Sequence, residues 1–142
     1  MPFVTESNLV GYDAEAAVGA ARDATDAELL AAASYTADGH QLLYVSDAFV
    51  DRYGSREAAD EVTERVHSYI RLDLIERDLF DDLVPAVGET RAFTTHTDTT
   101  VIVRVLAGDE GFYCSFMPGA EVTAVVEAVE AVIDGGRDDH RT

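Results

Sequence analysis

One strand candidate constrains the fold of this chain more than any other segment. The strand is predicted over residues 99–106 and contains the run Thr-Val-Ile-Val-Arg-Val-Leu, which is apolar at odd and even positions apart from Arg104. Because successive side chains of a strand point to opposite faces of its sheet, this strand needs apolar cover on both faces. The run therefore predicts a central strand in a sheet that carries helices on both sides.

Four further segments have the composition of strands. They are predicted over residues 29–36, 40–46, 90–97 and 110–117. The first two flank Asp38-Gly39, which is a hairpin signal because glycine accepts the positive φ of a tight turn. Thr25 and Glu28 also form a capping box, which would favour a helix over Thr25–Ala33. We prefer the strand because the hairpin needs a partner for its second half.

Helical periodicity predicts a helix near each end of the chain. The first covers residues 7–22, where alanines and valines share one face. The last repeats valine at the spacing i, i+3, i+4, i+7 from Val122 to Ile133, with glutamates directed outward. The pair Gly135-Gly136 is expected to close this last helix.

A long helical region is predicted between Gly54 and Pro85. Ser55 is its expected N-cap, and Pro85 ends it because proline has no N–H to donate. The apolar stripe of its first half does not continue through Asp73, and a second stripe in a different phase takes over. We therefore expect a kink or a break near Arg71–Asp73.

The predicted order of elements is α-β-β-α-β-β-β-α. An α+β fold with a five-stranded antiparallel sheet and helices on both faces would bury all of the apolar stripes. We expect one domain over residues 7–135, with flexible termini at residues 1–6 and 136–142.

The charge of the chain indicates its solvent. The sequence has 28 acidic residues against 10 basic ones, all of them arginine, and a formal net charge of −18. At about 1 M salt the Debye length falls to ~3 Å, so these charges hardly repel one another. A carboxylate-rich surface then holds water and loosely bound potassium ions. The composition predicts a halophilic protein of a salt-in archaeon.

The same charge argues against several partners. The arginines are interleaved with acids, as Arg65 is with Glu61 and Glu64, so neither nucleic acid nor an anionic membrane is expected as a partner. The single cysteine excludes an intramolecular disulfide, and the first residues lack the pattern of a signal peptide. We expect a cytoplasmic protein.

Most familiar catalytic and cofactor motifs are missing from the sequence. Without lysine there is no Walker A loop and no Schiff-base amine, and no Gly-x-Gly-x-x-Gly, HExxH or EF-hand pattern occurs. Cys114 would be the candidate nucleophile, but it alternates with Phe112 and Phe116 on one face of a predicted strand, which is typical of a core residue. We expect no cofactor, no catalytic residue and no enzyme.

Two metal-site hypotheses are weaker than their alternatives. His40, His67 and His96 would form a zinc site only if the fold brought them together, and no spacing ties any two of them. The second set consists of the carboxylates of Glu76, Asp78, Asp81 and Asp82. In so acidic a chain, a solvated face is the expected role of these carboxylates.

The aromatic residues divide between core and surface. Those that fall at strand or helix spacing are Tyr44, Tyr69, Phe80, Phe93, Phe112, Tyr113 and Phe116. Most are expected in the core. Tyr69 and Phe80 flank the phase change of the middle helix, where Leu72 and Ile75 begin the second stripe. These four residues are the candidate interaction surface.

The order of elements resembles the roadblock/dynein-light-chain and profilin-like folds over about residues 7–135. The local cues are the Asp38-Gly39 hairpin, the long middle helix, the Gly108–Gly111 turn and the valine-rich helix after Pro118-Gly119. Roadblock-like proteins commonly dimerise and act as scaffolds or regulators of small GTPases, and the resemblance implies such a role here.

A closer resemblance is to small haloarchaeal domains of unknown function. The similar stretches are residues 34–36 with 43–47, and residues 87–91 with 103–106. A family without an assigned activity implies no site.

These observations lead to three functional hypotheses. The first is a non-enzymatic regulatory or scaffold domain that forms a homodimer through the middle helix and an edge strand, and that acts on a small GTPase or signalling complex. The second is a small-ligand sensor with a closed pocket between the sheet and the long helix, lined by Tyr44, Phe93 and Phe112. The third is an enzyme that uses Cys114 or the histidines.

Overall fold

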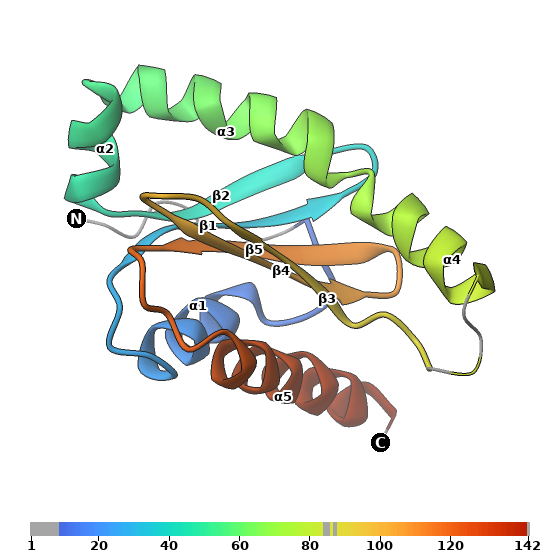
Figure 1. The fold of residues 1–142 in the computed structure, drawn as a ribbon. Helices are drawn as coiled ribbons and strands as arrows, with labels where there is room; N and C mark the ends of the chain where they lie inside the picture. Colours follow the sequence, from blue (N-terminus) through green and yellow to red (C-terminus); the bar gives the residue numbers. More distant parts are fainter. Residues whose placement is uncertain (1–8, 84–85, 87, 142) are drawn as a thin grey trace.

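The computed structural model describes residues 9–83, 86 and 88–141. Its elements are, in chain order, α1 (Ala14–Asp23), β1 (Leu29–Thr36), β2 (His40–Val45), α2 (Asp47–Tyr53), α3 (Arg56–Ile70), α4 (Asp73–Leu83), β3 (Ala92–His96), β4 (Val101–Ala107), β5 (Glu110–Phe116) and α5 (Val122–Arg141). Helices α1 and α5 lie on one side of the sheet, and α2, α3 and α4 lie on the other (Figure 1). The predicted α+β architecture is confirmed.

The five strands form one antiparallel sheet in the order β2-β1-β5-β4-β3. Strands β1 and β2 form the predicted hairpin, in which the Thr36 amide donates to the Gly39 carbonyl at 2.8 Å. Gly39 does not adopt the positive φ on which the turn prediction was based. The strand preferred over a helix at residues 25–33 is therefore confirmed. The Thr25 hydroxyl accepts instead from the amides of Ala27 and, at the start of α5, Glu121.

Each face of the sheet has its own hydrophobic cluster. Towards α1 and α5 the buried side chains include Val103, Phe112, Cys114 and Phe116, together with Val125 of α5. Towards α2 and α3 the cluster is smaller. It contains Leu30, Ala31, Ala33, Tyr35, Val45, Phe49, Ala59, Ile70 and Tyr113. On this second side the β4 side chains are only half-buried, so the α3 side of β4 and β3 is incompletely covered.

Helix α1 begins later than predicted. It starts at Ala14 with Asp13 as N-cap, whose carboxylate accepts from the Ala16 amide at 3.0 Å, whereas the sequence predicted a start at Ser7. The preceding residues are held by the β4–β5 turn. The Gly11 amide donates to the Glu110 carboxylate, and the Tyr12 hydroxyl donates to the Gly111 carbonyl at 2.8 Å. These tertiary bonds compete with helix formation before Asp13.

Helix α2 was not predicted. Its signals are nevertheless local, because the Ser46 hydroxyl accepts from the Phe49 amide at 3.1 Å and Gly54 follows the helix with a φ of 93°. Serine before a helix and a left-handed glycine after it are common boundary signals. The helix has only 7 residues, too few for its periodicity to be clear.

The middle helical region is divided where its stripe changes phase. Ser55 is the N-cap, as predicted, and accepts from the Ala58 amide at 3.1 Å. Helix α3 ends at Ile70 and α4 begins at Asp73, which confirms the expected break. Pro85, the predicted end of the region, lies outside the described residues.

Helix α5 does not end at Gly135-Gly136 as the sequence predicted, because it continues to Arg141. A glycine ends a helix when it adopts a positive φ, and the described glycines that do so are Gly54, Gly88, Gly108 and Gly119. A glycine inside a helix only lowers its stability, by about 1 kcal/mol.

Candidate functional site

Helix α4 presents large apolar side chains to solvent. We call this surface the α4 face and define it as Leu72, Ile75, Leu79, Phe80 and Leu83. Four of its residues follow one another at a spacing of three or four, namely Leu72, Ile75, Leu79 and Leu83. The fifth residue, Phe80, is 52% exposed. Tyr69, at the end of α3, is 74% exposed. Apolar groups gathered in this way are typical of contact sites with other proteins.

A buried ion pair fixes the start of α4 on the sheet. The Asp73 carboxylate accepts from Arg104 of β4, with Nε and Oδ2 2.9 Å apart, and from the Tyr35 hydroxyl of β1 at 3.2 Å. Arg104 also donates to the Thr95 hydroxyl and lies over the Phe93 ring. Burial and then the Asp73 charge raise the pKa of Tyr35. We call Asp73, Arg104 and Tyr35 the α4 clamp.

The C-terminal part of α4 is held by polar contacts. The Asp81 carboxylate accepts from both the amide and the hydroxyl of Thr90, each at 2.8 Å, and Arg77 donates to the Gly108 carbonyl. Asp81 is thus half-buried and anchors α4. The prediction that it belongs to a solvated face was wrong. The other three predicted carboxylates, Glu76, Asp78 and Asp82, are exposed.

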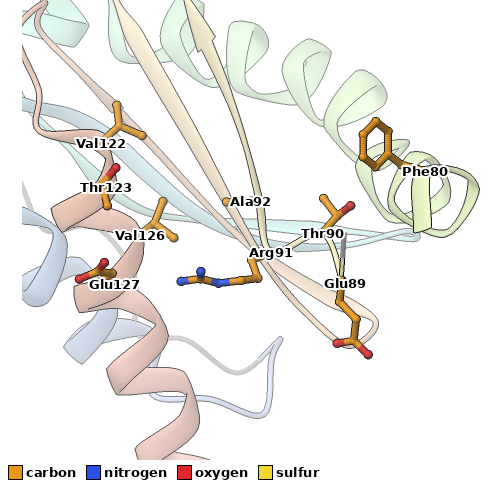
Figure 2. Close-up of a pocket in the computed structure, with 10 residues that line it drawn as sticks. Phe80, Glu89, Thr90, Arg91, Ala92, Val122, Thr123, Val126 and Glu127 are labelled. Atoms are coloured by element: carbon orange, nitrogen blue, oxygen red, sulfur yellow. The ribbon is translucent and has the colours of Figure 1, made fainter. Parts of the chain in front are cut away.

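The edge strand β3 lies close to the α4 face. Within the described residues β3 pairs with β4 alone, so its other edge is open. Beside it lies a groove of about 400 Å³ whose walls include Ala92, Val122, Val126 and Phe80. Figure 2 shows Arg91 extending towards α5, with Phe80 projecting from α4 on the other side of β3. Phe80 therefore links the α4 face to the edge of the sheet.

Cys114 has the properties of a core residue. It is fully buried between the sheet and α1/α5, and burial raises the pKa of its thiol. A protonated thiol without access to solvent is a poor nucleophile.

The three candidate histidines do not converge. His40 and His67 stack with their ring centroids 4.8 Å apart, a contact that no sequence spacing indicated. Burial and then the neighbouring His67 lower the pKa of His40. His96 pairs with Val101 at the opposite end of the sheet. Over the described ranges, no three histidine, cysteine or acidic side chains are grouped to hold a metal ion.

The predicted aromatic pocket is not assembled. Residues that pair across antiparallel strands point to the same face of the sheet. Phe93 pairs with Arg104, and Arg104 pairs with Tyr113, which lies on the α3 side. Phe93 therefore faces α3. Tyr44 and Phe112 instead belong to the core beneath α1 and α5. A hollow of about 230 Å³ does lie between α3 and the sheet, but other residues line it.

The order of the elements and the sheet topology define an α+β domain with a roadblock-like fold. The chain belongs to the family described as a domain of unknown function, DUF7522, whose model matches residues 15–134. No curated protein matches the sequence. In the part of the chain that the structure describes, no helix has the length and apolar character needed to cross a bilayer.

Solved structures share the fold at low sequence identity. A Roadblock/LC7 domain from Streptomyces avermitilis is similar with a TM-score of 0.57 and 12% identity, over 88% of this chain and 94% of that one. MglB from Myxococcus xanthus is similar with a TM-score of 0.56 and 10% identity, over 87% of this chain and 91% of that one. MglC from Myxococcus xanthus is similar with a TM-score of 0.52 and 10% identity, over 85% of this chain and 93% of that one. These likenesses establish the architecture.

Proposed function

We propose that this chain is a non-enzymatic regulatory or scaffold domain that forms a homodimer and acts through protein–protein contacts in a halophilic cytoplasm. The observation that carries the proposal is the α4 face. Its apolar side chains are exposed although both ends of the helix are held by polar contacts to the sheet. A helix that is fixed in place with its apolar side outward is suited to receive a second protein surface.

The open edge of β3 complements this face. Strand β3 reads Ala-Phe-Thr-Thr-His and carries no acidic residue, although the chain as a whole has a net charge of −18. A two-fold symmetric contact brings identical residues together, so an uncharged edge is the favourable place for two such acidic chains to meet. Pairing of β3 with its copy would place the α4 faces of both protomers beside the same interface.

The proposed surface is tested by replacing its two aromatic residues, Phe80 of the α4 face and Tyr69 at the end of α3. The variant Tyr69→Ser/Phe80→Ser is expected to be monomeric at concentrations where the wild type is dimeric. Each aromatic in the centre of an interface contributes about 2 kcal/mol, so the dissociation constant rises roughly 1,000-fold. Light scattering after size exclusion in 2 M KCl measures the mass.

The control is Tyr53→Ser, which removes another exposed aromatic at the end of α2 and should leave the mass unchanged. A monomeric wild type, or an unaltered dimer in the double variant, would contradict the proposed surface.

The regulated partner is proposed to be a small GTPase or a signalling complex that contains one. The roadblock-like fold supports this assignment by analogy alone. Affinity capture from the native host in molar KCl, read by mass spectrometry, should recover a P-loop protein in stoichiometric amount. The Tyr69→Ser/Phe80→Ser variant should recover less of it. Recovery of the bait alone would contradict the GTPase assignment.

The halophilic character is tested by the dependence of stability on salt. Between 0.1 M and 2 M KCl the melting temperature is expected to rise by about 10 °C or more, because the carboxylates repel one another until they are screened. Replacing Glu57, Glu61 and Glu64 of α3 by glutamine should shift the transition to lower salt, since all three are exposed. A melting temperature that does not respond to KCl would overturn the halophilic assignment.

A further inference from the structure

The hollow beneath α3 is separate from the proposed interaction surface. It lies between α2 and α3 on one side and β4, β5 and the β3–β4 turn on the other, and its volume is about 230 Å³. It exists because the α3 side of β4 is incompletely covered. Pockets for drug-sized ligands typically measure ~300–1,000 Å³, so this one suits a molecule about as large as a single substituted ring.

The floor of the hollow is closed by Ser115 of β5. Ser115 is 1% exposed, so its hydroxyl group is not accessible from the hollow. Burial raises the pKa of Tyr113, and its interaction with the Ser115 hydroxyl lowers it, so these two hydroxyl groups are neighbours. A ligand in the hollow therefore meets the side chains of the walls and the polar groups at the mouth.

The mouth of the hollow carries a guanidinium group that is held in place but not neutralised. Arg52 donates to the Thr100 hydroxyl at 2.7 Å and approaches the Thr99 carbonyl and the Met117 sulfur. These are neutral acceptors, and Arg52 is exposed. Among the described residues Arg22, Arg65 and Arg71 also form no ion pair, whereas Arg56, Arg77, Arg91 and Arg104 each pair with a carboxylate. In a chain with 28 acidic residues, a positioned arginine without an acidic partner in the described structure is a suitable anion contact.

Part of the wall of the hollow is apolar and consists of Val62 and Val66 of α3, Ile102 of β4 and Phe49 of α2. The remaining lining includes Tyr53, Thr97, Thr99, Thr100 and Tyr113. We propose that this hollow binds a small organic carboxylate, with its carboxylate at Arg52 and its ring or branched body against the apolar residues of the hollow. This inference does not depend on the homodimer or on a GTPase partner.

The binding test uses 4-hydroxyphenylacetate as the probe, titrated calorimetrically into the full chain in 2 M KCl. We expect saturable binding with a dissociation constant on the order of 1 mM or lower. Arg52→Gln should weaken binding of this probe at least tenfold and leave binding of the neutral 4-hydroxyphenylacetamide unchanged.

Two further variants make the test decisive. Val66→Phe should abolish binding by filling the hollow, whereas Arg56→Gln, which alters an exposed arginine paired with Asp60, should have no effect. The Tyr69→Ser/Phe80→Ser variant should bind the probe normally, so failure of the dimer proposal and failure of this one are distinguishable. Absence of saturable binding by the wild type, or binding that survives Arg52→Gln and Val66→Phe, would overturn the inference.

Discussion

Replacing Arg104 by leucine is expected to lower the free energy of unfolding by about 3–5 kcal/mol, because it leaves the buried Asp73 carboxylate without a counter-charge. Asp73 and the Arg104 side chain are nearly inaccessible, with 6% and 13% of their side-chain surfaces exposed. Screening by solvent therefore does little to compensate the loss. Urea denaturation in 2 M KCl, followed by circular dichroism, measures the change.

A matched variant separates the buried pair from surface charges. Arg56→Leu breaks the exposed pair with Asp60 and should change stability by less than about 1 kcal/mol. Adding Asp73→Asn to Arg104→Leu should recover part of the loss, since the amide oxygen still accepts from Tyr35 while the buried charge is gone. A loss below 1 kcal/mol, or strictly additive effects, would show that the α4 clamp does not hold the helix.

The clamp also matters for the interaction surface. Asp73 is the first residue of α4, so its bonds to β4 and β1 determine how the α4 face is presented. Arg104→Leu is therefore expected to weaken dimerisation even under conditions where the sheet remains folded. Loss of stability with an unchanged dimer would place the clamp in folding alone.

The second large effect is expected from Gly111→Ala, which should cost about 3 kcal/mol or more. A Cβ atom at Gly111 would lie under 3.0 Å from two ring carbons and the hydroxyl oxygen of Tyr35. The ring cannot easily move, because it is fully buried and its hydroxyl is bonded to Asp73. Overpacking a rigid core costs about 1–3 kcal/mol, and here it also strains the α4 clamp. The same denaturation experiment measures the loss.

Gly19→Ala provides a control of opposite sign. A Cβ at Gly19, inside α1, would meet no atom within 4 Å, so the variant should gain up to about 1 kcal/mol of helix stability. Combining Gly111→Ala with Tyr35→Ala should cost less than the sum of the two single changes, because the ring is no longer there to collide. A Gly111→Ala protein as stable as the wild type would contradict this packing.

Local signals in the sequence predicted most of the secondary structure. The Asp38-Gly39 turn and the Ser55 N-cap were found because a few adjacent residues decide them. The break between α3 and α4 followed from one change in periodicity. One wrong prediction, the start of α1, concerned residues that are held by Glu110 and Gly111, 99 residues away in the chain.

The candidate site was predicted in part. Tyr69, Leu72, Ile75 and Phe80 were chosen from the phase change alone, and the structure places all four at the surface. The groove that Phe80 shares with β3 and α5 had no sequence signal, and the pocket hypothesised between the sheet and the long helix was assigned other lining residues than those of the hollow beneath α3. Their residues come from different elements, and only the packing of those elements brings them together.

The sequence by itself determined the order of the strands and of the longer helices, the apolar pattern that covers the sheet on both faces, and the acidic composition. These properties depend on the spacing and composition of neighbouring residues. The tertiary structure alone decided that Phe93 faces away from Tyr44, that His40 stacks on His67, and that Asp73 is neutralised by Arg104. Such contacts depend on strand register and on the crossing of helices over the sheet, which arise from the packing of the whole chain.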